Sequence, residues 1–208
     1  MLTSLEGVMG SGKTLTAVAL AYTEFEQNQK RVISNDHLNF PYQFFDIQFF
    51  LDTLQGQELS NCVIILDEAY IYLDSRTTAG KLNKLFTYFI VQTRKRGVDM
   101  FFCTQHIDII EKRVRRACDV RGTCRYRGED PCTRCKGTGQ ILAKGIYVKC
   151  PRCLGGGKTG FATTTFLDLR SGRRTKVKVL GPAYWHLYDT TEIVPFTAKQ
   201  MKIPVEDL

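Results

Sequence analysis

The chain alternates between short extended runs and segments in which apolar residues recur every three or four positions. Residues 62–66 form the clearest run, because Cys-Val-Ile-Ile-Leu is apolar throughout, and such a run suits a parallel strand buried on both faces. Residues 2–8, 31–35 and 98–103 are further expected strands. A helix is expected over residues 14–27, with apolar positions at Leu15, Val18, Ala19, Tyr22 and Phe25. The pattern predicts an α/β core with a mainly parallel sheet.

A second helix and a late return to the sheet complete the pattern. Residues 81–95 are expected to form a helix, and its apolar face would be made by Leu82, Leu85, Phe86, Phe89, Ile90 and Thr93. Residues 161–169 and 175–180 are expected strands joined at Ser171-Gly172, lying antiparallel at the sheet edge. Residues 40–54 are rich in aromatics without interleaved Lys or Arg. This composition favours core packing or a subunit contact over base stacking.

Residues 7–14 match G-x-x-x-x-G-K-[ST], the loop whose backbone N–H groups wrap nucleotide phosphates. The loop consists of Gly7, Val8, Met9, Gly10, Ser11, Gly12, Lys13 and Thr14. We expect Lys13 to hold the β and γ phosphates of ATP and the Thr14 hydroxyl to coordinate Mg²⁺. The alternative is a glycine-rich turn with no ligand. The extended run before the loop and the helix after it favour the phosphate loop.

Two carboxylates, Asp67 and Glu68, follow the apolar run 62–66. Beside a phosphate loop, Asp67 would steady Mg²⁺ and Glu68 would polarise the water that attacks the γ phosphate. A surface acidic pair is the alternative. Because the two motifs occur together, they predict an ATPase.

Polar and basic residues further along could complete such a site. Gln105, in the polar tip of strand 98–103, could bind both the γ phosphate and the attacking water. Arg94 and Arg96 could reach a neighbouring subunit's nucleotide as an arginine finger. Alternatively, these arginines only complement the dipole at the end of helix 81–95.

These motifs, with residues 109–116 and a strand from Asp119, resemble the FtsK–HerA superfamily of DNA-pumping ATPases. Thr104-Gln105-His106-Ile107-Asp108 and Lys112-Arg113-Val114-Arg115 are most similar to its zonular-occludens-toxin-like branch. That branch includes morphogenesis ATPases of filamentous phages, and the wider superfamily includes viral genome-packaging ATPases. The resemblance covers residues 1–125 and resumes weakly at 184–195. It implies a RecA-like fold and gives Lys13, Thr14, Asp67, Glu68 and Gln105 the same catalytic roles.

Eight cysteines without a secretory signal indicate reduced thiols or metal binding. Cys132-x-x-Cys135 and Cys150-x-x-Cys153 have the spacing of a four-thiolate zinc site. Each pair is followed by glycines, in a repeat similar to the cysteine-rich modules of DnaJ chaperones. A redox role is the alternative, but it would need a pair at a helix start, and this stretch is turn-rich. The other four cysteines, Cys62, Cys103, Cys118 and Cys124, are interpreted as buried or free.

The net charge of +8 suggests a polyanionic partner. Residues 112–158 hold thirteen Lys and Arg against three acidic residues, so this stretch carries +10. Its surface should attract phosphate backbones without reading sequence, although a protrusion that contacts another protein is the alternative. Around the cysteines the cations are Arg125, Arg127, Arg134, Lys136, Lys144, Lys149, Arg152 and Lys158.

The sequence thus predicts an ATPase domain over residues 1–127 and 161–208, with a zinc-binding hairpin inserted at 128–160. No apolar run approaches eighteen residues, so we expect a soluble protein, unlike the membrane-spanning phage morphogenesis proteins. We expect the protein to form a homo-oligomeric ring in the host cytoplasm. The ring would act as a viral genome-packaging motor that translocates double-stranded DNA. Association with the virion, through capsid or internal-membrane vertex proteins, is a further option. The alternative function is a morphogenesis or secretion ATPase that drives virion assembly without pumping DNA.

Overall fold

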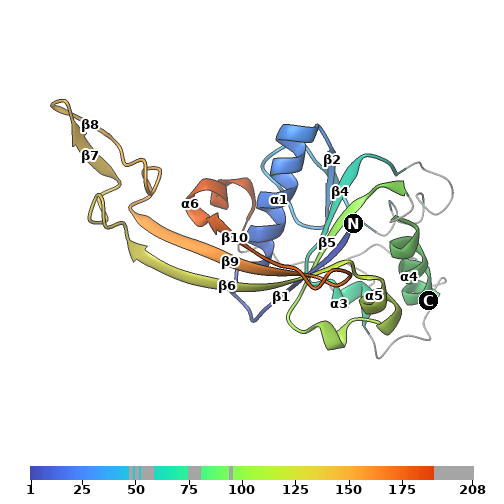
Figure 1. Cartoon of the computed structure of the whole chain (residues 1–208). Helices are drawn as coiled ribbons and strands as arrows, with labels where there is room; N and C mark the ends of the chain where they lie inside the picture. Colours follow the sequence, from blue (N-terminus) through green and yellow to red (C-terminus); the bar gives the residue numbers. More distant parts are fainter. Residues whose placement is uncertain (47–48, 50–51, 53–58, 75–80, 94–95, 190–208) are drawn as a thin grey trace.

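The computed structural model describes residues 1–46, 49, 52, 59–74, 81–93 and 96–189. Its main element is an eight-stranded sheet in the order β10-β9-β6-β1-β5-β4-β2-β3 (Figure 1). The strands are β1 (Leu2–Glu6), β2 (Arg31–Ser34), β3 (Gln43–Phe44), β4 (Cys62–Leu66), β5 (Asp99–Thr104), β6 (Val120–Pro131), β9 (Lys158–Asp168) and β10 (Arg174–Leu180). From β6 to β3 in this order, each strand runs parallel to its neighbours. Strands β9 and β10 extend the sheet beyond β6 as antiparallel strands. The mainly parallel α/β fold and the antiparallel return are confirmed.

Helices cover both faces of the sheet (Figure 1). One face carries α1 (Lys13–Asn28) with α6 (Gly181–Tyr184) and the 3-10 turn η4 (Trp185–Leu187). The other carries α3 (Tyr70–Leu73), α4 (Lys81–Thr93), the 3-10 turn η3 (Ile107–Ile109) and α5 (Lys112–Ala117). Because it has apolar packing on both sides, β4 has no exposed position, as its unbroken apolar sequence predicts.

Strand β5 lies between β1 and β4. Leu5 of β1 is level with Cys103 of β5, and Leu66 of β4 is level with Phe102. All three strands are parallel, so they end at one edge of the sheet, which we call the carboxyl edge. The segments after β1, β4 and β5 therefore lie side by side although they are far apart in sequence.

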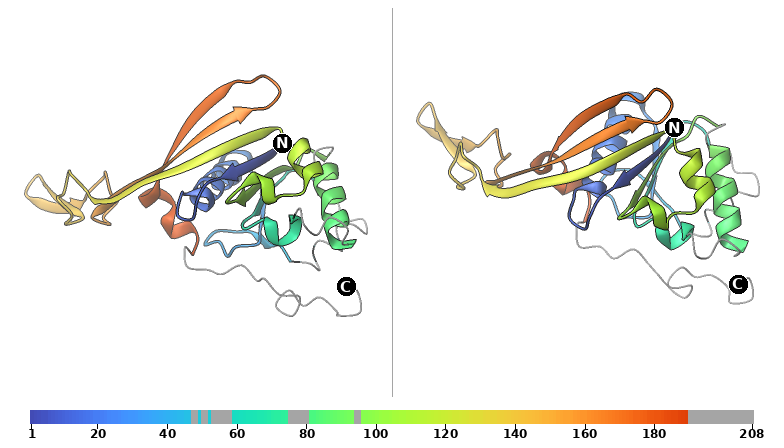
Figure 2. Two further views of the ribbon diagram at one scale, coloured as in Figure 1. Left: turned by 90° about the horizontal axis from the view of Figure 1, so that it is seen from below. Right: turned by 60° about the horizontal axis from the view of Figure 1, so that its bottom comes forward.

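Strands β6 and β9 form a ribbon that extends well beyond the body of the sheet (Figure 2). Only Val120 to Thr123 of β6 pairs with β1, whereas β6 pairs with β9 along almost its whole length. At the far end the chain folds into a separate two-stranded sheet, β7 (Gln140–Ala143) and β8 (Ile146–Lys149). Since β6 runs parallel to β1, this ribbon projects from the carboxyl edge.

The described aromatic residues after β2 pack into the core, which is one of the two placements expected for this segment. Phe45 and Phe49 are buried against Tyr72 and Phe86 on the α4 face, while Phe40 packs with Tyr22 on the α1 face. Residues 94–95 at the end of the predicted helix and the tail from 190 lie outside the described residues. No helix in the described part of the chain is long and apolar enough to cross a membrane.

Candidate nucleotide site and cysteine module

Residues 7–12 form the loop between the end of β1 and the start of α1, at the carboxyl edge. Gly12 caps α1 in the left-handed region, with a φ of 82°. A Cβ atom there would lie 2.7 Å from the Cβ atom of Ala162 on β9, so both the backbone angle and the available space require glycine. At the loop apex, Val8 and Met9 are 69% and 81% exposed. The loop thus combines a fixed base against β9 with an open apex.

Lys13 is buried and folds back over the loop. Its Nζ donates to the carbonyl oxygens of Gly7 at 3.0 Å and Val8 at 3.2 Å. This arrangement holds a positive charge inside the curve of the loop, beside the amino terminus of α1. Both the ammonium and the helix terminus favour an anionic group at this position.

The two oxygen donors expected to hold Mg²⁺ are in contact. Thr14 Oγ1 donates a hydrogen bond of 2.6 Å to Asp67 Oδ2, across the 53 residues between them in sequence. A hydroxyl and a carboxylate are the ligand types that Mg²⁺ takes beside substrate phosphates. The residues present therefore fit a magnesium site at this edge.

Asn35 fixes the backbone of Asp67. Its Oδ1 accepts from the Asp67 amide at 2.7 Å, and its Nδ2 donates to the Asp67 carbonyl at 2.8 Å. Asn35 is 1% exposed, so both hydrogen bonds are shielded from water. The strand predicted over residues 31–35 placed Asn35 only at its end. An amide side chain directly after a buried strand, next to the strand that carries Asp67, was the available signal.

Glu68 has the properties of a general base. Its φ is 46°, an unusual angle for a residue other than glycine. Its Oε2 is buried and has no hydrogen-bond partner among the described residues. Burial, and then the neighbouring Asp67 carboxylate, raise the pKa of Glu68 above its ordinary value, while Lys13 opposes the shift. A carboxylate with a raised pKa accepts a proton from water more readily.

Gln105 and the candidate arginine lie at opposite edges of the sheet. Gln105 is half-buried and directly follows β5, so it shares the carboxyl edge with the phosphate loop and Glu68. Arg96 is exposed and precedes β5, which places it at the other edge, away from its own chain's loop. It could approach a nucleotide only in another copy. Arg94 lies outside the described residues.

The ribbon contacts the helix that follows the phosphate loop. Thr16 on α1 and Thr164 on β9 share a buried hydrogen bond of 2.9 Å, and Thr164 Oγ1 also lies 3.3 Å from Cys124 Sγ on β6. Together with the contact between Gly12 and Ala162, these interactions join both strands of the ribbon to the nucleotide site. No local pattern predicts this connection, because Thr16 and Thr164 are 148 positions apart in the chain.

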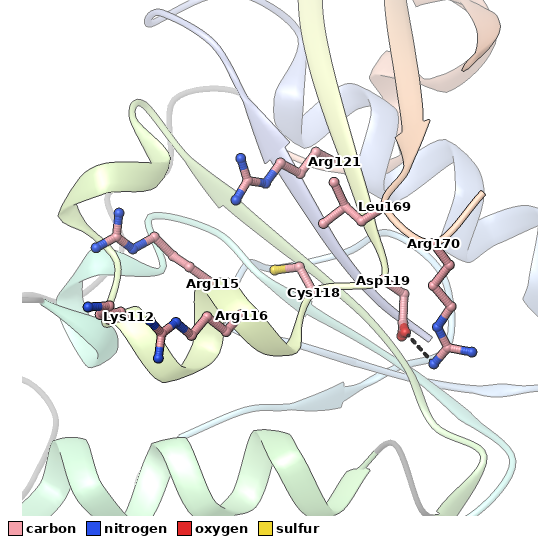
Figure 3. A pocket seen from close by; sticks show the side chains of 8 residues that line it. All are labelled: Lys112, Arg115, Arg116, Cys118, Asp119, Arg121, Leu169 and Arg170. Atoms are coloured by element: carbon pink, nitrogen blue, oxygen red, sulfur yellow. Dashed lines mark hydrogen bonds and ion pairs between the residues drawn. The ribbon is translucent and has the colours of Figure 1, made fainter. Parts of the chain in front are cut away.

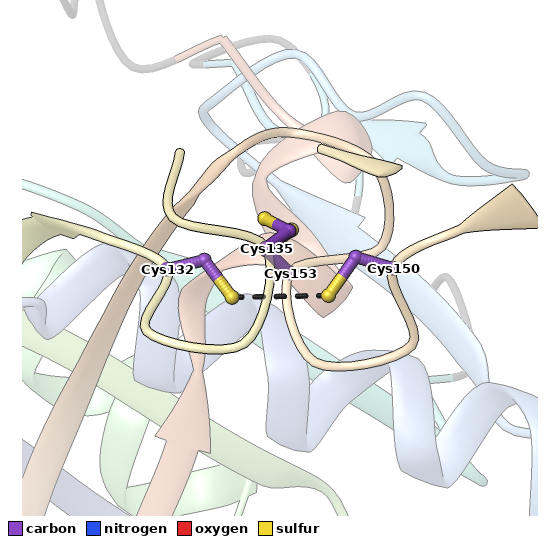
Figure 4. Close-up of side chains that lie close together, drawn as sticks. All are labelled: Cys132, Cys135, Cys150 and Cys153. Carbon is purple, nitrogen blue, oxygen red and sulfur yellow. Dashed lines mark hydrogen bonds between the residues drawn. The ribbon is translucent and has the colours of Figure 1, made fainter. Parts of the chain in front are cut away.

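Four buried cysteines meet at the far end of the ribbon (Figure 4). The Sγ atoms of Cys132, Cys135, Cys150 and Cys153 all lie within 4.8 Å of one another. Cys132 and Cys150 are 3.8 Å apart, and Cys135 and Cys153 are 3.6 Å apart. Tetrahedral zinc with Zn–S bonds of about 2.3 Å requires sulfur separations of about 3.75 Å. The cysteine module, residues 132–157, therefore has the dimensions of a zinc site.

The two Cys-x-x-Cys turns support each other reciprocally. The Cys132 amide donates to the Gly157 carbonyl at 2.7 Å, and the Cys150 amide donates to the Gly139 carbonyl at 2.8 Å. Although burial opposes it, the Gly139 amide, which donates to Sγ at 3.2 Å, helps to lower the pKa of Cys135 to about 6. A thiolate is the form that binds zinc, so Gly139 favours the metal-binding state of Cys135, whereas burial raises the pKa of Cys153 to about 11.

The eight cations around the module are all exposed, as a surface for a polyanion requires. The hairpin β7–β8 also exposes apolar side chains: Leu142 is 63%, Ile146 65% and Tyr147 75% exposed. Cys62, Cys103, Cys118 and Cys124 are buried, free and separate from the cluster.

Comparison with known proteins identifies one family. Residues 1–129 match the family described as Zonular occludens toxin (Zot). No curated protein matches the chain in sequence.

Solved structures share the fold across most of the chain. The N-terminal domain of zonular occludens toxin from Neisseria meningitidis is 15% identical, with a TM-score of 0.57, covering 90% of this chain and 98% of that one. The genome packaging NTPase B204 from Sulfolobus turreted icosahedral virus 2, in complex with ATP-gammaS, is 15% identical, with a TM-score of 0.53 over 84% and 95% of the two chains. B204 described as the DNA-packaging ATPase from Sulfolobus Turreted Icosahedral Virus is 14% identical, with the same TM-score and coverage. These likenesses establish a P-loop NTPase fold.

Proposed function

The chain belongs to the zonular occludens toxin (Zot) family, and from that premise we propose that it is an ATPase that translocates DNA. We further propose that it acts as a viral genome-packaging motor, in a ring of identical subunits. The observation that carries the ATPase assignment is the 2.6 Å hydrogen bond between Thr14 and Asp67 beside the folded-back Lys13. A glycine-rich turn without a ligand would have no need of a buried ammonium and a carboxylate brought together from distant parts of the chain.

Each residue of the nucleotide site has a separate role in ATP hydrolysis. The loop amides and Lys13 bind and orient the triphosphate, with the charge of Lys13 drawn from the loop carbonyls toward the phosphates. Thr14 and Asp67 would hold Mg²⁺, which, when bound, neutralises charge on the phosphate oxygens. Glu68 accepts the proton of the attacking water at its carboxylate. Gln105 orients that water from the neighbouring strand, and so distinguishes a filled from an empty γ-phosphate position.

The ring and the DNA contact rest on separate arguments. Arg96 precedes β5, at the edge of the sheet away from its own phosphate loop. If it acts as an arginine finger, it does so on a neighbouring copy, with nucleotide between subunits. The exposed cations of the cysteine module supply sequence-independent contacts to a phosphate backbone. The contacts of the ribbon with α1 provide a direct route from hydrolysis to that surface. We propose zinc as the structural metal of the module.

The second candidate function is a morphogenesis or secretion ATPase that assembles virions without pumping DNA. The exposed Leu142, Ile146 and Tyr147 at the tip of the module favour it, because apolar side chains on a protrusion suit a protein partner. In either role the protein would work in the host cytoplasm, with capsid or internal-membrane vertex proteins as partners in the virion.

Phosphate release measured with and without DNA separates the two functions. We expect double-stranded DNA of any sequence to stimulate ATP hydrolysis, and the stimulation to fall as salt rises. Stimulation only by a coat or membrane protein would favour the second function. Glu68→Gln should reduce turnover about 10²- to 10⁴-fold and leave ATP binding intact. Full turnover in this variant would remove Glu68 from the mechanism.

A further inference from the structure

A basic hollow lies on the face of the sheet that carries α5 (Figure 3). It has a volume of about 520 Å³ and is formed by α5, the start of β6 and the turn after β9. Five of its eight lining residues are cations. The lining residues are Lys112, Arg115, Arg116, Cys118, Asp119, Arg121, Leu169 and Arg170.

The hollow is positive even after all nearby acids are counted. Asp119 is the only carboxylate among its described lining residues, and it accepts hydrogen bonds from the Leu2 amide at 2.9 Å and from Arg170 at 3.1 Å. Asp108 pairs with Arg115 at 2.7 Å, and Glu6 lies near Arg121. Asp168, whose Oδ1 accepts from the Arg170 amide at 2.8 Å, is a fourth nearby acid. If all four acids are charged, the five cations still leave a charge of +1. Burial raises the pKa of Cys118 to about 12, so its thiol is neutral and adds no negative charge.

Two guanidinium groups in the hollow have donors without acceptors. The Nε atoms of Arg115 and Arg121 are buried and have no hydrogen-bond partner among the described residues. Among the described residues, no carboxylate lies within ion-pair distance of Lys112 or Arg116. Buried N–H groups nearly always find an acceptor, and planar guanidinium groups match the oxygens of a phosphate. The hollow is therefore built to accept an anion with several oxygens.

The cations continue along β6. Successive residues of a strand point to opposite faces, so Arg121, Arg125 and Arg127 share one face of β6 while Cys124 and Tyr126 face α1. At about 3.3 Å per residue, this row leads about 20 Å from the hollow along the ribbon toward the cysteine module. A single small anion would use only the hollow, whereas a polymer of phosphates could occupy the whole row.

We propose that the hollow binds the phosphodiester backbone of DNA and that the row on β6 guides the strand from it to the cysteine module. The inference rests on the proposed DNA-translocating function and names where the backbone is gripped. In the described part of the chain no aromatic side chain lines the hollow, and its apolar contribution comes from Leu169 and Cys118, so these residues offer no face on which a base could stack. Contacts to phosphates alone give binding without sequence preference. Because the hollow lies on the face of the sheet that carries α5, whereas the phosphate loop leads into α1 on the other face, DNA there does not compete with ATP.

Binding of a fluorescent duplex of about 30 base pairs tests the proposal, with nucleotide absent and salt varied from about 50 to 200 mM. We expect Lys112→Glu combined with Arg116→Glu to weaken binding at least about tenfold. The same change should reduce the slope of log K against log salt by about 2, since each phosphate contact contributes about 0.9. Lys176→Glu combined with Lys178→Glu, on the exposed side of β10, is the matched control. It changes the charge equally and should leave the slope nearly unaltered.

Basal ATP hydrolysis and the melting temperature establish that both double variants are folded. The proposal is overturned if the two variants weaken DNA binding equally, or if the unmodified protein does not bind the duplex. If the two variants weaken binding equally and DNA still stimulates hydrolysis by the Lys112 and Arg116 variant, the proposed function stands without this site. If DNA does not stimulate ATP hydrolysis by the unmodified protein, the proposed function itself is refuted.

Discussion

The two hydrogen bonds of Asn35 to the backbone of Asp67, which we call the clamp, give the sharpest test of how the nucleotide site is held in place. In Asn35→Ala, the amide and the carbonyl of Asp67 lose their partners at 2.7 and 2.8 Å. Each buried group left unsatisfied costs about 1–3 kcal/mol. Some relief comes from water entering the space of the lost side chain, so we expect a total near 2–4 kcal/mol. For a protein of this length, that corresponds to a fall in melting temperature of about 4–16 °C.

Turnover should fall as well, because the Asp67 carboxylate accepts the 2.6 Å hydrogen bond from Thr14 only if its backbone is fixed. Displacement of a catalytic group by about 1 Å can cost about 10²-fold in rate, so we expect a loss of about 10- to 100-fold. Thermal unfolding and steady-state ATP hydrolysis measure the two effects.

Asn39→Ala provides the control for the clamp. Asn39 also donates to a backbone carbonyl, that of His186 at 2.8 Å, but it is exposed. We expect a change in the free energy of unfolding of less than about 0.5 kcal/mol and full turnover. The reasoning is refuted if Asn35→Ala matches Asn39→Ala in both stability and rate.

Two further predictions concern α5 and the cysteine module. Glu111 is 3% exposed and accepts from the amides of Arg113 at 2.6 Å and Val114 at 3.2 Å, so Glu111→Ala should destabilise the fold by about 1–2 kcal/mol in urea unfolding. Burial raises the pKa of Glu111, but hydrogen bonds from Arg113 outweigh it and hold the pKa below its ordinary 4.5. The charged side chain therefore stabilises the fold above that pH and loses this effect as the pH falls below it. The difference in the free energy of unfolding between the unmodified protein and Glu111→Gln should therefore shrink as the pH falls. A difference that does not depend on pH would contradict this role of the Glu111 carboxylate. Metal analysis should find one zinc per chain. Chelation should loosen the backbone of the module, so that trypsin cleaves after Arg134, Lys136, Lys149 and Arg152 at least about tenfold faster, while the sheet still melts as a unit. Equal cleavage with and without chelator would show that the module needs no metal.

Local patterns were sufficient to predict the parts of the molecule in which neighbouring residues share one environment. Residues 62–66 are apolar throughout because β4 is covered on both faces. The glycines of residues 7–14 and the two Cys-x-x-Cys turns are required by the loops in which they occur. In these cases a pattern within a few positions of the chain indicates the role of each residue, even where, as at Gly12 beside Ala162, part of the physical reason lies far away in sequence.

Features that depend on pairing between distant segments could not be predicted. The clamp joins Asn35 to Asp67 only because β2 lies beside β4. The length of β6 was missed because residues 127–131, Arg-Gly-Glu-Asp-Pro, lack the apolar alternation of a half-buried strand. In the basic hollow, Arg170 joins Lys112 and Arg121 only through the pairing of β9 with β6.

The base of the cysteine module is a single cross-strand pair, Pro131 opposite Lys158. Everything between these residues leaves and re-enters the ribbon at neighbouring positions, and the match to the Zot family ends close by, at residue 129. Such an attachment point tolerates excision or exchange, because the remaining strands can be rejoined by a tight turn without shifting register. Modules from other proteins could thus be grafted onto this P-loop domain, so that the partner contacted at the end of the ribbon could be changed without altering the phosphate loop.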